Sequence, residues 1–243
     1  MRSKLAALLG RALKVVMVVV VVPLAVGLLA GVLRQLEELR AAGASVREWI
    51  VWGFLTYVGL HVILYRPVAL FRINHRLFSA LAVWLFGGHV TSVEQAGSAR
   101  NESRPNKGKR SRGESKESEA RGSTLVAFSP YVIPLWTVLA CAAAWALSHW
   151  WDWALIGAPV SFLIGMTTAF HWVMTADDLQ PQRERWHVET YLLAVGLVFV
   201  LTLLISAAAL SVAVPGFSFV EALGDGLSRA QTIYTTLIRR LFL

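Results

Sequence analysis

The chain has 243 residues, of which 56% are hydrophobic and only 16% are charged, and its mean hydropathy is +0.57. A water-soluble domain needs a more polar surface than this composition supplies. The net charge of +8 does not indicate a nucleic-acid-binding protein, because the most basic segment, residues 91–123, has no aromatic residue and mixes Lys and Arg with Glu. We therefore expect an all-α integral membrane protein surrounded by membrane lipid, with no nucleic-acid partner.

The N-terminal segment, residues 1–14, carries four basic residues and no acidic one. The apolar run after it is too long for the hydrophobic part of a signal peptide, so we expect it to remain in the membrane as an anchor. Basic residues flank membrane spans mainly on the cytoplasmic side, which predicts a cytoplasmic N-terminus.

Several apolar runs approach the length of about 20 residues that a membrane-spanning helix needs. Four of them contain no Asp, Glu, Lys or Arg, and a fifth is shorter and contains His61. We predict about five transmembrane helices, over residues 15–33, 49–65, 124–147, 153–175 and 191–214. In the first of these, Gly27 and Gly31 form a G-x-x-x-G pattern, which permits close packing of a second helix.

Residues 77–86 are apolar but only about half as long as a span, and Gly87 and Gly88 follow them. This profile predicts a short re-entrant or interfacial helix at the end of a unit that covers residues 15–90. Residues 91–123 then form a polar, basic segment with too few apolar residues to bury, and we predict that it is disordered.

Residues 124–214 are predicted to form a three-span bundle. Pro130 and Pro134 interrupt the hydrogen bonding of its first helix, which frees backbone carbonyls to face a cavity. His171 lies inside the second helix of this bundle, and Asp177 and Asp178 follow just beyond it. Ionisable side chains within a membrane usually have a partner or a role, so we interpret these three residues as a polar site.

The tail, residues 215–243, places apolar residues at helical spacing with charged residues between them. This pattern predicts an amphipathic helix that either lies on the membrane or docks on a partner.

Four short motifs follow one another in an order that resembles a known family. They are His75-Arg76-Leu77-Phe78-Ser79, Gly87-Gly88-His89-Val90, Pro130-Tyr131-Val132-Ile133-Pro134 and Phe170-His171-Trp172-Val173-Met174-Thr175. In this order they resemble the site-2-protease-like zinc intramembrane metalloproteases, in the branch formed by bacterial membrane proteins. The resemblance covers residues 50–210 and implies a multi-pass protein of the bacterial inner membrane.

The first motif lacks two of the three groups that catalysis in this family requires. In H-E-x-x-H, two histidines bind zinc and the glutamate takes a proton from the metal-bound water. His75 remains, whereas Arg76 replaces the glutamate with a permanent cation and Ser79 replaces the second histidine with a poor zinc ligand. The resemblance therefore implies a catalytically inactive protein, with no catalytic residue and no metal expected.

These observations predict a membrane scaffold or an accessory subunit that works with other membrane-protein subunits. Two alternatives stay open. A divergent zinc-dependent intramembrane metalloprotease would use His75, His171 and an Asp, and would contain bound zinc. A haem-binding electron carrier would use His61, His75 and His89, which are fourteen residues apart, but the turns between them keep them off one straight helix.

Overall fold

The computed structural model of the chain describes residues 2–41, 43–64, 77, 131–180, 183 and 187–242. Within these residues the fold is helical apart from one small hairpin, which confirms the helical fold class. The elements are α1 (Arg2–Glu38), β1 (Arg40–Ala41), β2 (Ala44–Ser45), α2 (Val46–Leu64), α6 (Leu135–Leu147), α7 (Trp153–Leu179), α8 (Val188–Ala213) and α9 (Phe219–Phe242). The segment predicted to be disordered and, except for Leu77, the short helix predicted at 77–86 lie outside the described residues.

The β1–β2 hairpin reverses the chain between α1 and α2. Its strands are antiparallel, with Arg40 opposite Ser45, and Gly43 takes a φ of 82° in the turn, which glycine adopts without strain. The Ser45 hydroxyl accepts a hydrogen bond from the backbone N–H of Glu48 at 3.2 Å and lies 3.1 Å from its carboxylate. This cap explains why α2 begins directly after the hairpin.

A second polar cap starts α7 after a tight turn. The Asp152 carboxylate accepts from the backbone N–H of Ala154 at 3.2 Å. Trp150 and Trp151 lie in this turn with 77% and 53% of their surface exposed. Exposed tryptophans at the end of apolar helices are typical of a membrane interface.

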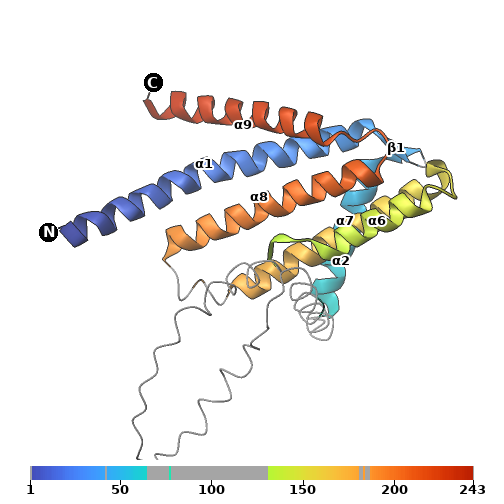
Figure 1. Cartoon of the computed structure of the whole chain (residues 1–243), viewed down its shortest axis with the longest axis horizontal. Helices are drawn as coiled ribbons and strands as arrows, with labels where there is room; N and C mark the ends of the chain where they lie inside the picture. Colours follow the sequence, from blue (N-terminus) through green and yellow to red (C-terminus); the bar gives the residue numbers. More distant parts are fainter. Residues whose placement is uncertain are drawn as a thin grey trace, which may run out of the picture. The chain divides into compact units, whose positions relative to one another are not determined.

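Helices α1, α8 and α9 lie side by side (Figure 1). The Lys14 ammonium donates to the Thr190 hydroxyl at 2.9 Å, and further along both helices Gly196 of α8 faces Val21 of α1, so α1 and α8 run in the same direction. Gln35, near the end of α1, donates to Glu221 at the start of α9 at 3.0 Å. Helix α9 therefore returns antiparallel to α1.

Helix α7 packs against α2 and α6, and α6 also contacts α8. The α2–α7 contact depends on two glycines. A Cβ atom at Gly53 would overlap the backbone of Phe162, and one at Gly165 would overlap the backbone of Ile50. Only glycine allows the two helix backbones to come this close.

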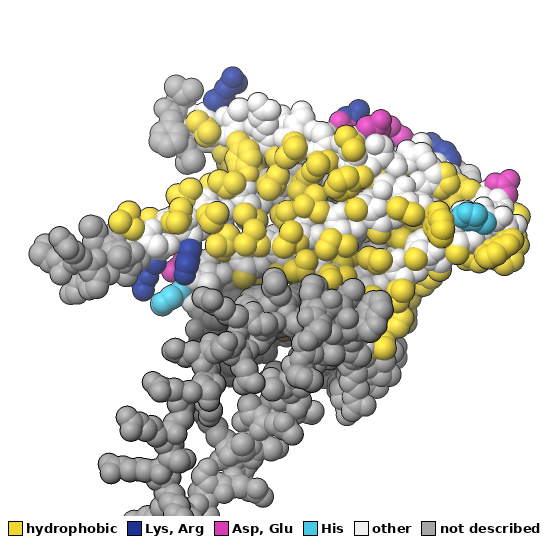
Figure 2. All heavy atoms as spheres, viewed as in Figure 1, with side chains coloured by type: hydrophobic (Ala, Val, Ile, Leu, Met, Phe, Trp, Pro, Cys, Tyr) yellow, Lys and Arg dark blue, Asp and Glu magenta, His cyan; other side chains and the backbone are white. Residues whose placement is uncertain are grey.

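Three described helical segments are long and apolar enough to cross a membrane, namely Leu9–Glu38, Trp153–Leu179 and Val188–Ala213. The prediction of a membrane protein with transmembrane helices is thus supported for three of the five proposed spans. The other two proposed spans correspond to α6 and α2. Helix α6 has only 13 residues, because the helix is interrupted just before Leu135. Helix α2, as far as it is described, is not among the long apolar helices. Apolar side chains cover the middle of the face in Figure 2, as expected for a surface in lipid, and charged side chains lie at its two ends and along its upper edge.

Candidate functional site

The residues of the degenerate protease motif, His75, Arg76 and Ser79, lie outside the described residues, and so does Pro130. The interpretation of that motif stays a prediction. The described helices contain a different polar site, which is a buried junction of α6, α7 and α8 around the interrupted start of α6.

Pro134 causes the interruption at this junction. It is the N-cap of α6, with φ −76° and ψ 71°, and residues 133–134 are not helical. The N–H of Leu135 would reach the Tyr131 carbonyl in a continuous helix, but it donates to the Ile133 carbonyl instead, at 2.9 Å. The predicted effect of proline is present as a break in the helix, which leaves carbonyls without their usual partners.

Side chains from two other helices satisfy these carbonyls. The Thr202 hydroxyl of α8 lies 3.2 Å from the Val132 carbonyl, 3.4 Å from the Tyr131 carbonyl and 3.5 Å from Nε2 of His171 on α7. The His171 ring also interacts with the Tyr131 carbonyl. Thr202 and His171 are 1% and 3% exposed, so this network is buried. A buried carbonyl without a partner is costly, and the network removes that cost.

Thr137 adds a second polar link between α6 and α7. Its hydroxyl lies 3.3 Å from that of Thr168, which itself donates to the Ile164 carbonyl at 2.7 Å. Because the single proton of Thr168 is already used, Thr137 is the donor between the two hydroxyls. Thr137 is fully buried.

The structure does not bring the predicted acidic residues onto His171. Asp177 and Asp178 lie six and seven positions further along α7, a rise of about 9 to 10.5 Å along the helix axis. Asp178 instead interacts electrostatically with Tyr131. Among the described residues, no three His, Cys, Asp or Glu side chains come together as a metal site.

The haem alternative depends on three histidines, of which the structure describes one. His61 is on α2, where its ring lies 6.1 Å from the Tyr57 ring, and His75 and His89 lie outside the described residues.

An open pocket of about 210 Å³ lies beside the junction, between α7 and α8. His171 and Thr202 form part of its lining, and Trp172, Thr175 and Phe199 form another part. Thr202 and His171 contact the backbone carbonyls of the junction. The pocket beside it is lined by side chains of α7 and α8.

The predicted G-x-x-x-G pattern lies at the contact between α1 and α9. A Cβ atom at Gly27 would approach the backbone oxygen of Gly226 to 2.6 Å and Ala230 to 2.7 Å, and one at Gly31 would approach the Ala222 oxygen to 2.5 Å. Helix α9 thus presents a stripe of small residues, four positions apart, to the two glycines of α1. The prediction from the sequence did not include this stripe, although the spacing of Ala222, Gly226 and Ala230 matches that of the two glycines.

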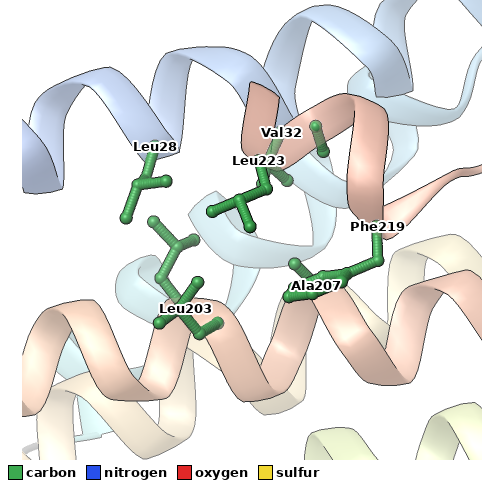
Figure 3. Close-up of a pocket in the computed structure, with 8 residues that line it drawn as sticks. Leu28, Val32, Leu203, Ala207, Phe219 and Leu223 are labelled. Atoms are coloured by element: carbon green, nitrogen blue, oxygen red, sulfur yellow. The ribbon is translucent and has the colours of Figure 1, made fainter. Parts of the chain in front are cut away.

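Larger apolar residues close the space beside this contact. Figure 3 shows Leu28 and Val32 of α1, Leu203 and Ala207 of α8, and Phe219 and Leu223 of α9 facing one another. The void between them is about 10 Å³, which is too small for a ligand and barely the size of a water site. The tail helix therefore docks on its own chain through a packed apolar interface.

Polar contacts also hold α9 against α1. Arg34 forms an ion pair with Asp225 at 3.2 Å, and the Tyr234 hydroxyl donates to the Val20 carbonyl. These contacts extend along the membrane-spanning part of α1, from Gln35 to Val20.

No protein-family model, curated protein or solved structure matches this chain. The class that the structure itself defines is a helical membrane protein with a buried polar junction at a broken helix.

Proposed function

We propose that this protein is a non-catalytic membrane scaffold or accessory subunit that binds another membrane protein through α9. The proposed lack of catalytic activity depends on the sequence, in which Arg76 and Ser79 replace two groups of a zinc protease motif. The binding part depends on one observation, which is the position of Arg229.

Arg229 is exposed and lies next to Ala230, the residue that contacts Gly27. Gly27 is well inside the apolar run of α1, so the backbone of Arg229 is at the depth of that run. Within the described part of the chain, Arg229 has no carboxylate partner. A cation at this depth costs several kcal/mol when it faces lipid, and it is usually paired.

Three hydroxyl residues lie near Arg229 on the exposed surface of α9, which also carries the apolar side chains of Val220, Leu227, Leu237 and Ile238. Ser228, Thr232 and Thr235 are exposed, and the hydroxyls of Thr232 and Thr235 donate to carbonyls of their own helix, at 3.1 and 3.0 Å. Their oxygens keep lone pairs free to accept hydrogen bonds. We call Ser228, Arg229, Thr232 and Thr235 the polar face of α9. A transmembrane helix with an Asp or Glu near its middle supplies the charge and the hydrogen bonds that this face requires.

The test is site-specific photocrosslinking in native membranes. A benzoylphenylalanine residue at Thr232 is expected to give one adduct with a membrane protein, in a peptide that lies within a span and contains Asp or Glu. The same residue at Val22, which is an exposed apolar position of α1, is the control for contact with lipid and for random collision.

Arg229→Gln is expected to lower the Thr232 adduct at least fivefold, whereas Arg240→Gln, at the exposed end of the helix, leaves it unchanged. Exchange of the charges, with Arg229→Glu and Arg in place of the partner's acidic residue, restores the adduct. The proposal is wrong if Thr232 crosslinks only to lipid or to a second copy of this chain, or if the adduct does not depend on Arg229.

A further inference from the structure

Basic side chains of α1 and α9 lie at one level of the bundle. The Tyr234 hydroxyl of α9 donates to the Val20 carbonyl of α1, and the two helices are antiparallel. Lys14 and Arg240 are each six positions from this contact in the same direction, which is about 9 Å along the helix axes. In the sequence, neither α1 before Val20 nor α9 after Tyr234 contains an Asp or a Glu. We use the name basic band for the cations within one turn of this level, namely Arg11, Lys14, Arg239 and Arg240.

Two cations of the basic band, Arg11 and Lys14, also border α8. They are three positions apart and so lie on one face of α1. The Lys14 ammonium donates to the Thr190 hydroxyl at 2.9 Å, whereas Nε of Arg11 lies 3.9 Å from the Glu189 carboxylate, which is too far for a hydrogen bond. An ammonium has three donors and a guanidinium has five. Within the described part of the chain, most donors of this pair are therefore available to an anion.

Exposed apolar side chains surround this pair on both helices. Leu13, Val16 and Val19 of α1 are exposed, and so is Leu192 of α8. A soluble anion would contact only the two cations. A phospholipid would place its phosphate beside them and its acyl chains along the apolar surface, so this combination favours a lipid.

We propose that Arg11 and Lys14 bind the phosphate of an acidic phospholipid whose acyl chains lie along α1 and α8. The guanidinium can donate two parallel N–H groups to phosphate oxygens, and the ammonium adds a point charge beside it. A headgroup with net negative charge is preferred over a zwitterionic one, because the two cations repel the choline group of the latter. The site does not involve Arg229, so it goes beyond the proposed scaffold role.

Binding of dioctanoyl phosphatidylglycerol to the full-length protein in a neutral detergent tests the proposal. Native mass spectrometry resolves each bound lipid and gives its Kd. Dioctanoyl phosphatidylcholine has the same chains without the net charge, and inorganic phosphate has the charge without the chains. We expect phosphatidylglycerol to bind about tenfold more tightly than phosphatidylcholine, because each cation near an acidic lipid contributes roughly fivefold and Glu189 opposes them. Inorganic phosphate should bind far more weakly than either lipid.

Two double variants separate this site from positive charge in general. Arg11→Gln with Lys14→Gln is expected to abolish the preference for phosphatidylglycerol. Arg239→Gln with Arg240→Gln removes the same charge from the end of α9 and is the matched control, which keeps the preference. Glu189→Gln removes the acidic side chain beside the pair and is expected to tighten binding of phosphatidylglycerol about three- to fivefold. A misfolded variant could not give this gain.

Thr190→Val separates headgroup binding from helix packing. It removes the hydrogen bond between Lys14 and Thr190 and keeps both cations, so the preference should remain. Arg11→Gln alone is expected to lower the preference roughly fivefold, and it is the variant to use if the double variant unfolds, because Arg11 is exposed. The proposal is overturned if phosphatidylglycerol is not preferred, if inorganic phosphate binds as tightly as the lipid, or if both double variants lose the preference equally.

Discussion

Thr202 shows how a single hydroxyl can connect three helices. The break at Pro134 directs the N–H of Leu135, the regular partner of the Tyr131 carbonyl, to Ile133, and Thr202 and His171 supply replacements from α8 and α7. In lipid these carbonyls cannot turn to water, so the side chains that bind them stabilise the fold as well as shape the adjacent cavity.

Thr202→Val is expected to lower the free energy of unfolding by about 1 kcal/mol, because it leaves buried carbonyls of the junction short of a donor. Reversible unfolding in mixed micelles measures this change. Thr167→Val is the control, since the Thr167 hydroxyl only supplements the hydrogen bonds of its own helix. Equal losses in the two variants would show that Thr202 has no special role at the junction.

The metal content of the protein tests the zinc alternative at the level of single residues. We expect far less than one zinc per chain by elemental mass spectrometry, because the predicted resemblance to zinc proteases puts Arg76 and Ser79 in the places of a base and a ligand. His75→Ala and His171→Ala should leave this value unchanged. Near-stoichiometric zinc that falls in either variant would revive a divergent metalloprotease.

Glycine contacts determine which helices can pair. The α1–α9 and α2–α7 contacts both bring backbones so close that a Cβ atom would meet backbone atoms of the neighbouring helix. Small residues of this kind allow dispersion and backbone contacts to replace a hydrophobic driving force that is weak within lipid. The two contacts are therefore sensitive to a single added methyl group.

Two glycines of α2 provide a matched test of this sensitivity. Gly53→Ala is expected to destabilise the protein by about 1 to 3 kcal/mol, because the new methyl group overlaps the backbone of Phe162. Gly59→Ala has nothing within 4 Å and should be neutral or stabilising by up to about 1 kcal/mol, since alanine favours helix. Unfolding in micelles compares the variants, and a neutral Gly53→Ala would mean that α2 and α7 are further apart than the structure shows.

At the scale of the whole molecule, the direction of α9 is the main result. Because α9 runs antiparallel along α1, its C-terminal end lies toward the N-terminal half of α1. Arg239 and Arg240 are near that end, and Arg11 and Lys14 are near the start of α1. Basic residues on both helices thus lie toward the same side of the membrane, in agreement with the positive-inside tendency.

Cysteine accessibility tests this arrangement in a Cys141→Ala background. We expect Arg11→Cys and Arg240→Cys to react with a membrane-impermeant maleimide only after the cells are opened, because both lie on the predicted cytoplasmic side. Ser218→Cys, just before α9, should react in intact cells. If Ser218→Cys and Arg240→Cys react from the same side, α9 lies on one membrane surface and not along α1.

The sequence by itself determined the helical membrane class, the amphipathic character of the tail and the capacity of Gly27 and Gly31 for close packing. These properties follow from local composition and spacing, which act over a few helical turns. Tertiary structure decided what those segments contact: α9 packs on α1, Thr202 meets the carbonyls freed by Pro134, and Asp177 and Asp178 are set apart from His171. Thr202 is about 70 residues from Tyr131 and Val132 in the chain, and no local pattern connects them. The direction of the helices and the distance between them bring such residues together, and neither property follows from the spacing of residues in a single sequence.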